Sequence, residues 1–302
     1  MSRKGVYITE RDGMAVVKLD SGYNIGVPPA SCTLTERPAT VSLKQADVVQ
    51  DKNLPTLAIV STGGTIASRI DYRTGSVTSQ FNASDILTAI PELKEIANYR
   101  TIPLATILSE NMTPAIWQDL ARAIHAEIKN GAKGIIVTHG TDTMAYSAAA
   151  ISFMIDTPVP VIFVGSQRSA DRPSSDNAMN AACAAAAATS GLGEVVVVMH
   201  ATTNDDTCAI HRGTRVRKMH SSYRSTFRTI GDTPLAMITR KGLQHIKQDY
   251  NPRRKDRQVT IKPFFEEKVG MIYYYTNMQP DMIDSMVDAG YKGIIIIGTG
   301  LG

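Results

Sequence analysis

Cysteine is scarce in this sequence, and its spacing excludes two kinds of small structural framework. The 302 residues contain three cysteines, Cys32, Cys183 and Cys208, and no two of them form a C-x-x-C pair. An odd number of widely spaced cysteines builds neither a disulfide framework nor a zinc ribbon. Reduced thiols in a cytosol fit this pattern better, so the sequence predicts a cytoplasmic protein.

Membrane, metal and nucleotide signatures are missing as well. The first residues, MSRKGVYITERDG, lack the apolar core of a signal peptide, and no apolar run approaches the roughly 18 residues that span a bilayer. The six histidines show no H-E-x-x-H or other close ligand spacing, so no metal is expected. No G-x-x-x-x-G-K-[ST] loop or kinase signature occurs, so this chain is expected to hold no cofactor.

What is present suffices for one large core and a smaller one. Hydrophobic residues make up 43% of the chain, and 32 basic against 28 acidic residues leave a net charge of +4, which neither requires nor excludes a polyanionic partner. The pattern divides the chain into four parts. These are a small β-barrel-like module at 1–45, a polar linker at 46–55, an α/β domain at 56–263 and the start of a second α/β domain at 264–302.

The module before residue 46 reads as short β-rich pieces broken by turns such as Asp12-Gly13. From Thr56 onward, apolar strands alternate with segments of helical period, which is typical of an α/β fold with a parallel sheet. One expected helix lies in ASDILTAIPELKEIANY, at 83–99. Another is capped by Thr113, has Pro114 at its first position and stops at Gly131.

Ligands of parallel sheets sit at the carboxyl ends of the strands, so the strand exits are the places to search. The stretch STGGT, at 61–65, combines glycines that permit close backbone approach with Thr65. A second exit, HGTDT at 139–143, places Thr141 beside Asp142 at the start of a helix. Taken singly, the first is also a common tight turn, the second an ordinary helix cap, and the basic run at 211–228 a solvated face.

Taken together, these stretches resemble the type I/II L-asparaginase family. The resemblance rests on STGGTIAS, AIPELKEIAN, THGTDTMAYSAAAISFM, VPVIFVGSQRSADRPSSDN and RKMHSSYRSTF, which occur in one order and spacing. Within that family, the leading β-rich module, LDSGYNIGV, DYRTG, LSENMTP, RPSSDN and HRGTRVRKMH resemble the D subunits of archaeal glutamyl-tRNA(Gln) amidotransferases. The resemblance runs from about residue 16 to the end of the sequence.

The resemblance implies that four residues carry out amide hydrolysis. Thr65 is the residue expected to be acylated, and Thr141, Lys218 and Asp142 are expected to move protons, with Asp142 orienting the lysine. Which threonine attacks first is left open. For Lys218 to accept a proton near neutral pH, its pKa has to be lowered by burial. Backbone N–H groups of the glycine turn, at Gly64, serve as donors to the oxyanion.

Substrate binding is assigned by the same resemblance. Ser109 and Glu110 stand where asparaginases hold the α-carboxylate and α-ammonium groups, although many of them have a glutamine in place of Glu110. A carboxylate there can bind the ammonium, as can Asp142. Tyr72 is placed by rough position as a lid residue that assists Thr65. The amidotransferase resemblance favours glutamine over asparagine as the substrate.

Three functions are compatible with the sequence. The first is a glutaminase subunit that releases ammonia for a partner, the E subunit, which amidates Glu-tRNA(Gln) with ATP and Mg²⁺ in a heterodimer or a dimer of heterodimers. Glu-tRNA(Gln) is then bound mainly by the partner. The alternative is a free-standing cytosolic L-asparaginase, which needs no β-rich module. A third is a nonenzymatic nucleotide- or tRNA-binding protein, against which the paired TGGT and HGTDT motifs argue.

The last segment carries an expectation of its own. DMIDSMVDAGYKGIIIIGTGLG reads as a helix, a glycine-terminated turn and a four-isoleucine strand, which is the opening of a βαβ unit. Residues 264–302 fall short of the roughly 50 residues of an independent domain, so we expect this domain to be incomplete. The short chain is then expected to aggregate and to have little glutaminase activity until a C-terminal extension of about one hundred residues is restored.

Overall fold

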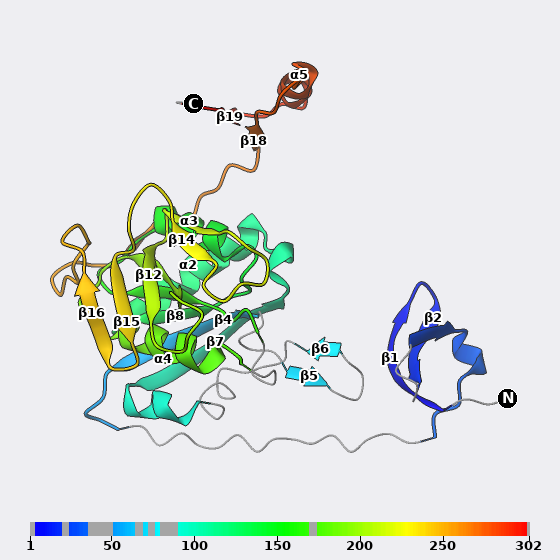
Figure 1. Cartoon of the computed structure of the whole chain (residues 1–302), viewed down its shortest axis with the longest axis horizontal. Coiled ribbons are helices and arrows are strands. Elements are labelled where there is room, and N and C mark those ends of the chain that lie inside the picture. Colours follow the sequence, from blue (N-terminus) through cyan, green and yellow to red (C-terminus); the bar gives the residue numbers. More distant parts are fainter. Residues whose placement is uncertain are drawn as a thin grey trace.

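The fold is known from a computed structural model (Figure 1), which describes residues 4–19, 24–35, 51–63, 69–71, 76–78, 90–168 and 174–300. The statements below concern these residues. Three of the predicted site residues, Gly64, Thr65 and Tyr72, lie outside them. None of the described helices is both long and apolar enough to cross a membrane.

The β-rich module begins with a three-stranded antiparallel sheet. Its strands are β1 (Gly5–Arg11), β2 (Met14–Leu19) and β3 (Asn24–Val27). The predicted turn at Asp12-Gly13 is confirmed, because both residues have positive φ, 51° and 72°, as a tight hairpin requires. A short 3₁₀ turn, η1 (Pro29–Ser31), follows. The barrel-like form predicted for the whole module 1–45 involves positions outside the described ranges.

An eight-stranded sheet in the order β16-β15-β12-β11-β10-β8-β4-β7 forms the centre of the α/β part. Its parallel strands, which confirm the predicted α/β class, are β4 (Thr56–Gly63), β7 (Asn98–Ile107), β8 (Ile135–Thr138), β10 (Val161–Val164) and β11 (Val195–His200). Three further strands extend the sheet antiparallel: β12 (Cys208–Arg212), β15 (Ala236–Thr239) and β16 (Gly242–Ile246). The sheet is therefore mixed rather than purely parallel.

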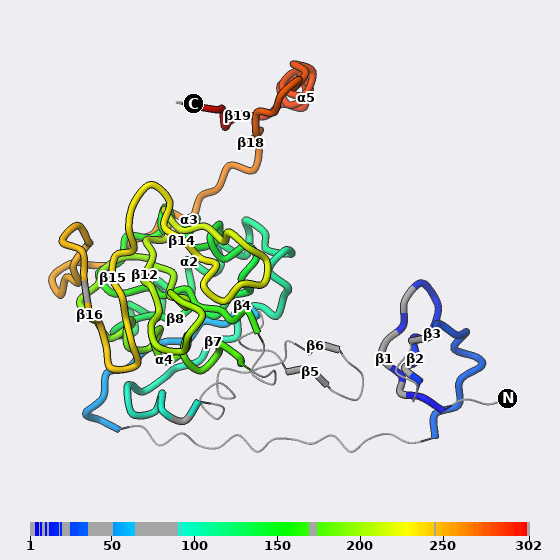
Figure 2. The backbone as a smooth tube through the Cα atoms, viewed as in Figure 1, coloured from blue at the N-terminus to red at the C-terminus, as the bar shows by residue number. Residues whose placement is uncertain are grey.

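Helices cover both faces of this sheet, and each face has its own core. Alternate residues of β4 point to opposite sides, so Leu57 and Ile59 join the core beneath α4 (Asn177–Ala188). Ala58 and Val60 join the core beneath α2 (Pro114–Lys129) and α3 (Met144–Met154). Figure 2 shows α2 and α3 together on one side of the strands and α4 on the other. Burial on both faces explains why these strands are continuously apolar.

Helix α2 begins and ends where its sequence predicts. The Thr113 side chain accepts a hydrogen bond from the backbone N–H of Ile116 at 3.4 Å, and Pro114 occupies the first position. Gly131, with φ of 88°, ends the helix in a conformation that suits glycine. Leu120 and Ile124 are fully buried, so this face of the helix packs on the sheet.

The helix expected at 83–99 is wrong for the residues that the structure describes. Residues Pro91–Glu95 form a short 3₁₀ helix, η3, and β7 starts at Asn98. Proline at 91 favours this turn, and the edge position of β7 accommodates a second proline, Pro103, that an inner strand excludes. The portion of the prediction at 83–89 lies outside the described residues.

Shorter strand pairs complete the described chain. They are β5 (Arg69–Asp71) with β6 (Ser76–Thr78), β9 (Ile155–Asp156) with β17 (Thr260–Ile261), and the hairpin of β13 (Val216–Lys218) and β14 (Phe227–Thr229). At the end, β18 (Val269–Tyr273) and β19 (Gly293–Ile297) pair in parallel, with α5 (Asp281–Asp288) between them in the chain. This arrangement confirms the βαβ unit predicted from the isoleucine run.

Candidate active site

The candidate site lies at the carboxyl ends of β4, β7 and β8, as expected for a parallel sheet. At the exit of β4, Gly63 has φ of 105°, and a Cβ there would lie 2.5 Å from the carbonyl oxygen of Ile107. The register between β4 and β7 shifts between Ser61 and Gly63. Glycine is therefore required at the end of this strand, in addition to any role of the turn in binding.

The exit of β8 presents Thr141 and Asp142 just before α3. Thr141 is 7% exposed, and the helix starts at Met144, which confirms the predicted position of HGTDT at a helix start. Behind this turn, Gly165 packs so closely that a Cβ on it would lie 2.6 Å from the carbonyl oxygen of His139. The turn is thus held between β8 and the exit of β10.

Lys218 meets both residues of this turn, although it lies 77 positions beyond Thr141 in the chain. Its Nζ donates to Thr141 Oγ1 at 2.8 Å and to Asp142 Oδ1 at 2.8 Å. The lysine side chain is only 10% exposed, whereas that of Asp142 is 66% exposed. This arrangement places an amine in direct contact with a hydroxyl and orients it through a carboxylate, which is the geometry of a proton-transfer relay.

Ser109 is brought to the same turn by the end of β7. It opens the 3₁₀ turn η4 (Ser109–Asn111), and its carbonyl oxygen accepts a hydrogen bond from Thr143 Oγ1 at 2.7 Å. A Cβ on Gly140 would lie 2.7 Å from Ser109 Cβ, so the two segments are in direct contact. Ser109 is buried and Glu110 is exposed. Ser109, Glu110, Thr141 and Asp142 therefore belong to adjoining turns, and Lys218, the last residue of β13, contacts the second of them.

His139 is buried beside these residues and stays neutral. Burial lowers the pKa of His139 to about 4. The hydrogen bond between its Nδ1 and the Gly140 carbonyl oxygen, at 2.7 Å, acts in the opposite direction but has the smaller effect. Its Nε2 has no hydrogen-bond partner among the described residues. The histidine packs on Phe163 with ring centroids 5.9 Å apart, so it supports the turn instead of titrating near neutral pH.

A buried carboxylate that the sequence analysis did not single out fixes the loop after β10. Asp176 is fully buried and accepts hydrogen bonds from Ser166 Oγ, the backbone N–H groups of Gln167 and Arg168, and Asn180 Nδ2, at 2.8 to 3.0 Å. An aspartate directly before an alanine-rich helix is an N-cap signal. The carboxylate nevertheless accepts no cap bond from a backbone N–H of α4. It binds the loop and the side chain of Asn180 in the first turns of the helix.

This loop in turn holds the segment that follows Lys218. Gln167 Nε2 donates to the carbonyl oxygens of Tyr223 at 2.9 Å and Ser221 at 3.3 Å. On the other side of the segment, Arg224 forms an ion pair with Asp205. The hairpin that carries the lysine is thereby fixed from both sides, which no spacing in the sequence indicates.

Within the ranges that the structure describes, no group of three or more histidine, cysteine, aspartate or glutamate side chains is arranged to hold a metal ion. The chemistry that the arrangement offers is proton transfer and nucleophilic attack by hydroxyl groups.

Comparison with known proteins gives consistent results. Residues 56–251 match the family model described as Asparaginase, N-terminal. The D subunit of the glutamyl-tRNA(Gln) amidotransferase from Methanosarcina mazei is 50% identical over 99% of this chain and 74% of its own length. The corresponding D subunit from Halobacterium salinarum strain R1 is 48% identical over 100% of this chain and 74% of its own length.

Two asparaginases are among the solved structures with a similar fold. The thermostable L-asparaginase from Thermococcus kodakarensis superposes with a TM-score of 0.72 at 29% identity, covering 82% of this chain and 72% of that one. The probable cytoplasmic L-asparaginase from Campylobacter jejuni gives a TM-score of 0.67 at 26% identity, covering 82% of this chain and 75% of that one.

Proposed function

The chain belongs to the asparaginase family, and from this premise we propose that it is the glutamine-hydrolysing subunit of a glutamyl-tRNA(Gln) amidotransferase. The observation that carries the proposal is the contact of Lys218 Nζ with Thr141 Oγ1 and Asp142 Oδ1, both at 2.8 Å. Such a contact supplies a base for a hydroxyl group, which amide hydrolysis by a threonine requires.

In the proposed reaction the hydroxyl of Thr65 attacks the side-chain amide carbon of glutamine. The proton passes to the Thr141–Lys218 pair, and the amide nitrogen takes a proton as the C–N bond breaks and ammonia leaves. Water then hydrolyses the acyl-threonine and releases glutamate. Asp142 orients the Lys218 amine that takes this proton, and N–H groups of the turn at Gly64 stabilise the oxyanion.

Ser109 and Glu110 are proposed to bind the α-carboxylate and the α-ammonium group, with Tyr72 closing over the substrate. The contact of Ser109 with Gly140 supports the role of Ser109 in substrate binding, because the serine hydroxyl lies against the turn that carries Thr141. The exposed carboxylate of Glu110 suits a cation such as the ammonium group.

The word subunit in the names of the relatives indicates a multi-subunit enzyme. We propose that the partner is the E subunit, that ATP, Mg²⁺ and Glu-tRNA(Gln) bind mainly there, and that ammonia passes from this chain to it. No cofactor is proposed for the glutaminase step. A cytoplasmic location is part of the proposal, supported by the cytoplasmic asparaginase among the structural neighbours.

A free-standing asparaginase is the less favoured function. The relatives at about 50% identity are named as amidotransferase subunits, whereas the asparaginases are 26% and 29% identical. A nonenzymatic RNA-binding protein is disfavoured by the relay at Lys218, which binding alone does not need.

Ammonia release measured with glutamine and asparagine side by side tests the proposal. We expect glutamine to be hydrolysed in preference to asparagine, and a Lys218→Met variant to lose about 10³-fold in rate. Lys241→Met, which removes an exposed lysine from a turn before β16, serves as the control and keeps the wild-type rate. Preference for asparagine, or wild-type ammonia release by Lys218→Met, would contradict the proposal.

A further inference from the structure

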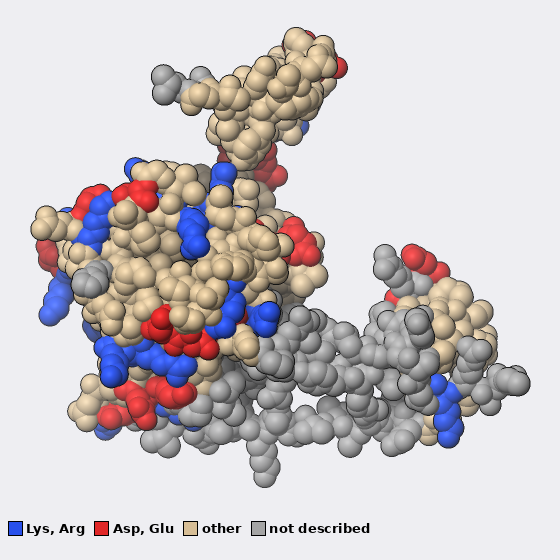
Figure 3. All heavy atoms as spheres, viewed as in Figure 1, with Lys and Arg blue, Asp and Glu red and all other residues tan. Residues whose placement is uncertain are grey.

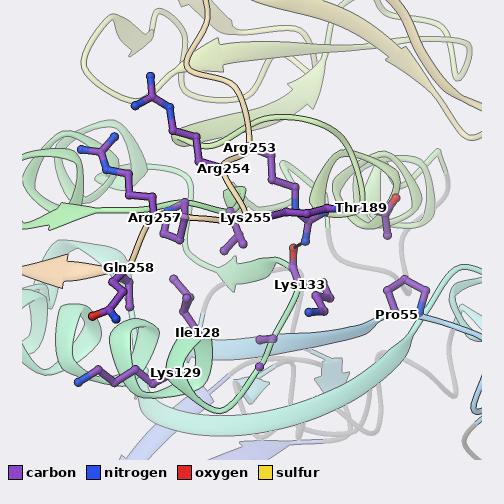
Figure 4. Close-up of a pocket in the computed structure, with 15 residues that line it drawn as sticks. Pro55, Ile128, Lys129, Lys133, Thr189, Arg253, Arg254, Lys255, Arg257 and Gln258 are labelled. Atoms are coloured by element: carbon purple, nitrogen blue, oxygen red, sulfur yellow. Dashed lines mark hydrogen bonds between the residues drawn. The ribbon is translucent and has the colours of Figure 1, made fainter.

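A pocket lies at the amino ends of the parallel strands, whereas Thr141 lies at their carboxyl ends. Its lining includes Pro55 before β4, Gly131–Lys133 before β8 and Pro158–Val159 before β10, which are the amino ends of parallel strands. The segment 253–259 forms another wall (Figure 4). The pocket encloses about 820 Å³, within the range of roughly 300–1,000 Å³ that small-molecule sites occupy.

The lining of this pocket is charged with a single sign. Among its described residues it contains no aspartate or glutamate, and its basic members are Lys129, Lys133, Arg253, Arg254, Lys255 and Arg257. Elsewhere on the α/β part basic and acidic residues lie interspersed, as the face in Figure 3 shows. Figure 4 shows Lys129 and Lys133 on the side of α2 and the arginines on the side of the 253–259 segment.

Most of these cations have no neutralising partner among the residues that the structure describes. Arg257 forms an ion pair with Asp156. For Lys129, Lys133, Arg254 and Lys255, no carboxylate of the described chain lies within ion-pair distance. Like charges gathered around one concavity repel each other, and this repulsion is relieved when an anion binds.

Arg253 also has no carboxylate partner among the described residues, and it is partly buried. Its guanidinium donates to the carbonyl oxygens of Lys133 and Ser190, and it pairs with no carboxylate among the described residues. Burial lowers the pKa of Arg253 below its usual range. A guanidinium that is desolvated beside neutral acceptors gains most from a charged one.

The chemistry of the lining selects among anions. Six cations line this one pocket. A phosphate-rich anion suits them better than an acidic peptide, since linked phosphates carry several charges within a few ångströms and accept paired bonds from arginine. Ile128, Val159 and Val259 give the pocket apolar walls, and Thr189 and Gln258 offer polar contacts. No aromatic side chain is among the described residues that line it, so stacking of bases on the protein plays no part.

We propose that this basic pocket binds a phosphate-rich anion: a polyphosphate chain, either free in a nucleotide or as the phosphate backbone of an RNA. The site is separate from the proposed glutaminase centre, because it lies at the opposite ends of the same strands. It is also separate from the ATP of the amidation step, which we assign to the partner. Its function does not depend on the assignment of glutamine as the substrate.

Isothermal titration calorimetry with inorganic tripolyphosphate tests the proposal on the full chain. We expect binding that weakens as salt rises between about 50 and 200 mM. The double variant Arg254→Glu/Lys255→Glu is expected to bind at least about tenfold more weakly. Lys241→Glu/Lys292→Glu changes the net charge equally at exposed lysines outside the pocket lining and is expected to bind as the wild type does.

Further titrations identify the source of the phosphates. ATP binding tighter than tripolyphosphate, with the same loss in the pocket variant, supports a nucleotide; an RNA oligonucleotide that binds tighter than ATP supports the phosphate backbone. Two results overturn the proposal. One is that the pocket variant and the control variant weaken tripolyphosphate binding equally, which would mean that the anion is attracted by the net charge alone. The other is poly-glutamate binding as tightly as tripolyphosphate, which means that carboxylates suffice.

Discussion

At the scale of single residues, Asp142 is the member of the relay whose role is easiest to separate from folding. Its side chain is 66% exposed, so its ion pair with Lys218 contributes little to stability. We expect Asp142→Asn to change the free energy of unfolding by less than about 1 kcal/mol and to lower glutamine turnover about 10³-fold.

The matched control for this variant is Asp119→Asn. Asp119 forms an exposed ion pair with Arg122 on α2, outside every motif assigned to the site. Urea unfolding and ammonia release are measured on both variants. Wild-type turnover by Asp142→Asn would show that the carboxylate does not orient the lysine.

Asp176 differs from Asp142 because its carboxylate stabilises the fold and has no assigned role in the reaction. It is fully buried with four donors around it, so an amide in its place turns two hydrogens toward groups that also donate. Asp176→Asn is expected to destabilise the fold by about 2–4 kcal/mol in urea unfolding. Asp206→Asn, at an exposed carboxylate that accepts from Thr202, should change stability little. Equal stability of the two variants would contradict the account.

Two buried histidines predict a pH dependence of stability. Burial lowers the pKa of His139 and of His211 to about 4, and the charge of Arg228 adds to the effect at His211. The unfolded chain binds a proton near pH 6.5 while the folded chain does not, so stability is retained above about 6.5 and falls as the pH drops toward 4. In His211→Gln the slope over this range should fall by up to about 1.4 kcal/mol per pH unit. The free energy of unfolding is measured by urea at several pH values. An equal dependence of this free energy on pH in variant and wild type would contradict the prediction.

At the scale of elements, the contact between the ends of β7 and β8 joins Ser109 to the catalytic turn. A Cβ on Gly140 would lie 2.7 Å from Ser109 Cβ and 2.8 Å from its Oγ. Gly140→Ala should therefore destabilise the protein by about 1–3 kcal/mol and slow glutamine hydrolysis. Adding Ser109→Gly removes the colliding atoms and should restore most of the stability but not the substrate binding. Failure of the double variant to regain stability would place the strain elsewhere.

The elements that the sequence predicted share one property, a regular apolar period backed by local signals. Helix α2 has Thr113, Pro114 and Gly131 at its boundaries, and β8 is a continuous apolar run. The antiparallel strands β12, β15 and β16 were not predicted. In β12 and β16 the apolar residues are mixed with histidine, arginine or glutamine, which weakens the strand pattern. Strand β7 was not predicted because it contains Pro103, and proline disfavours a strand unless the strand lies at the edge of a sheet.

At the scale of the whole molecule, the candidate site depends on contacts that local sequence does not encode. The position of Thr141 and Asp142 at a strand exit follows from periodicity. Their contact with Lys218, 77 positions from Thr141, was indicated only by the family resemblance. The network around Asp176 and Gln167 was not predicted at all. Most partners of these two side chains are backbone groups, which every residue carries and which no sequence motif therefore indicates.

Transfer of labelled nitrogen tests the central claim most directly. The chain is combined with its proposed E subunit, ATP, Glu-tRNA(Gln) and glutamine labelled with ¹⁵N in the side-chain amide, and ¹⁵N is measured in the tRNA-bound glutamine. We predict that the wild-type pair transfers the label, and that a pair with Lys218→Met transfers none from glutamine yet still forms Gln-tRNA(Gln) when ammonium is supplied. Transfer of the label from glutamine by the Lys218→Met pair at the wild-type rate would contradict the account.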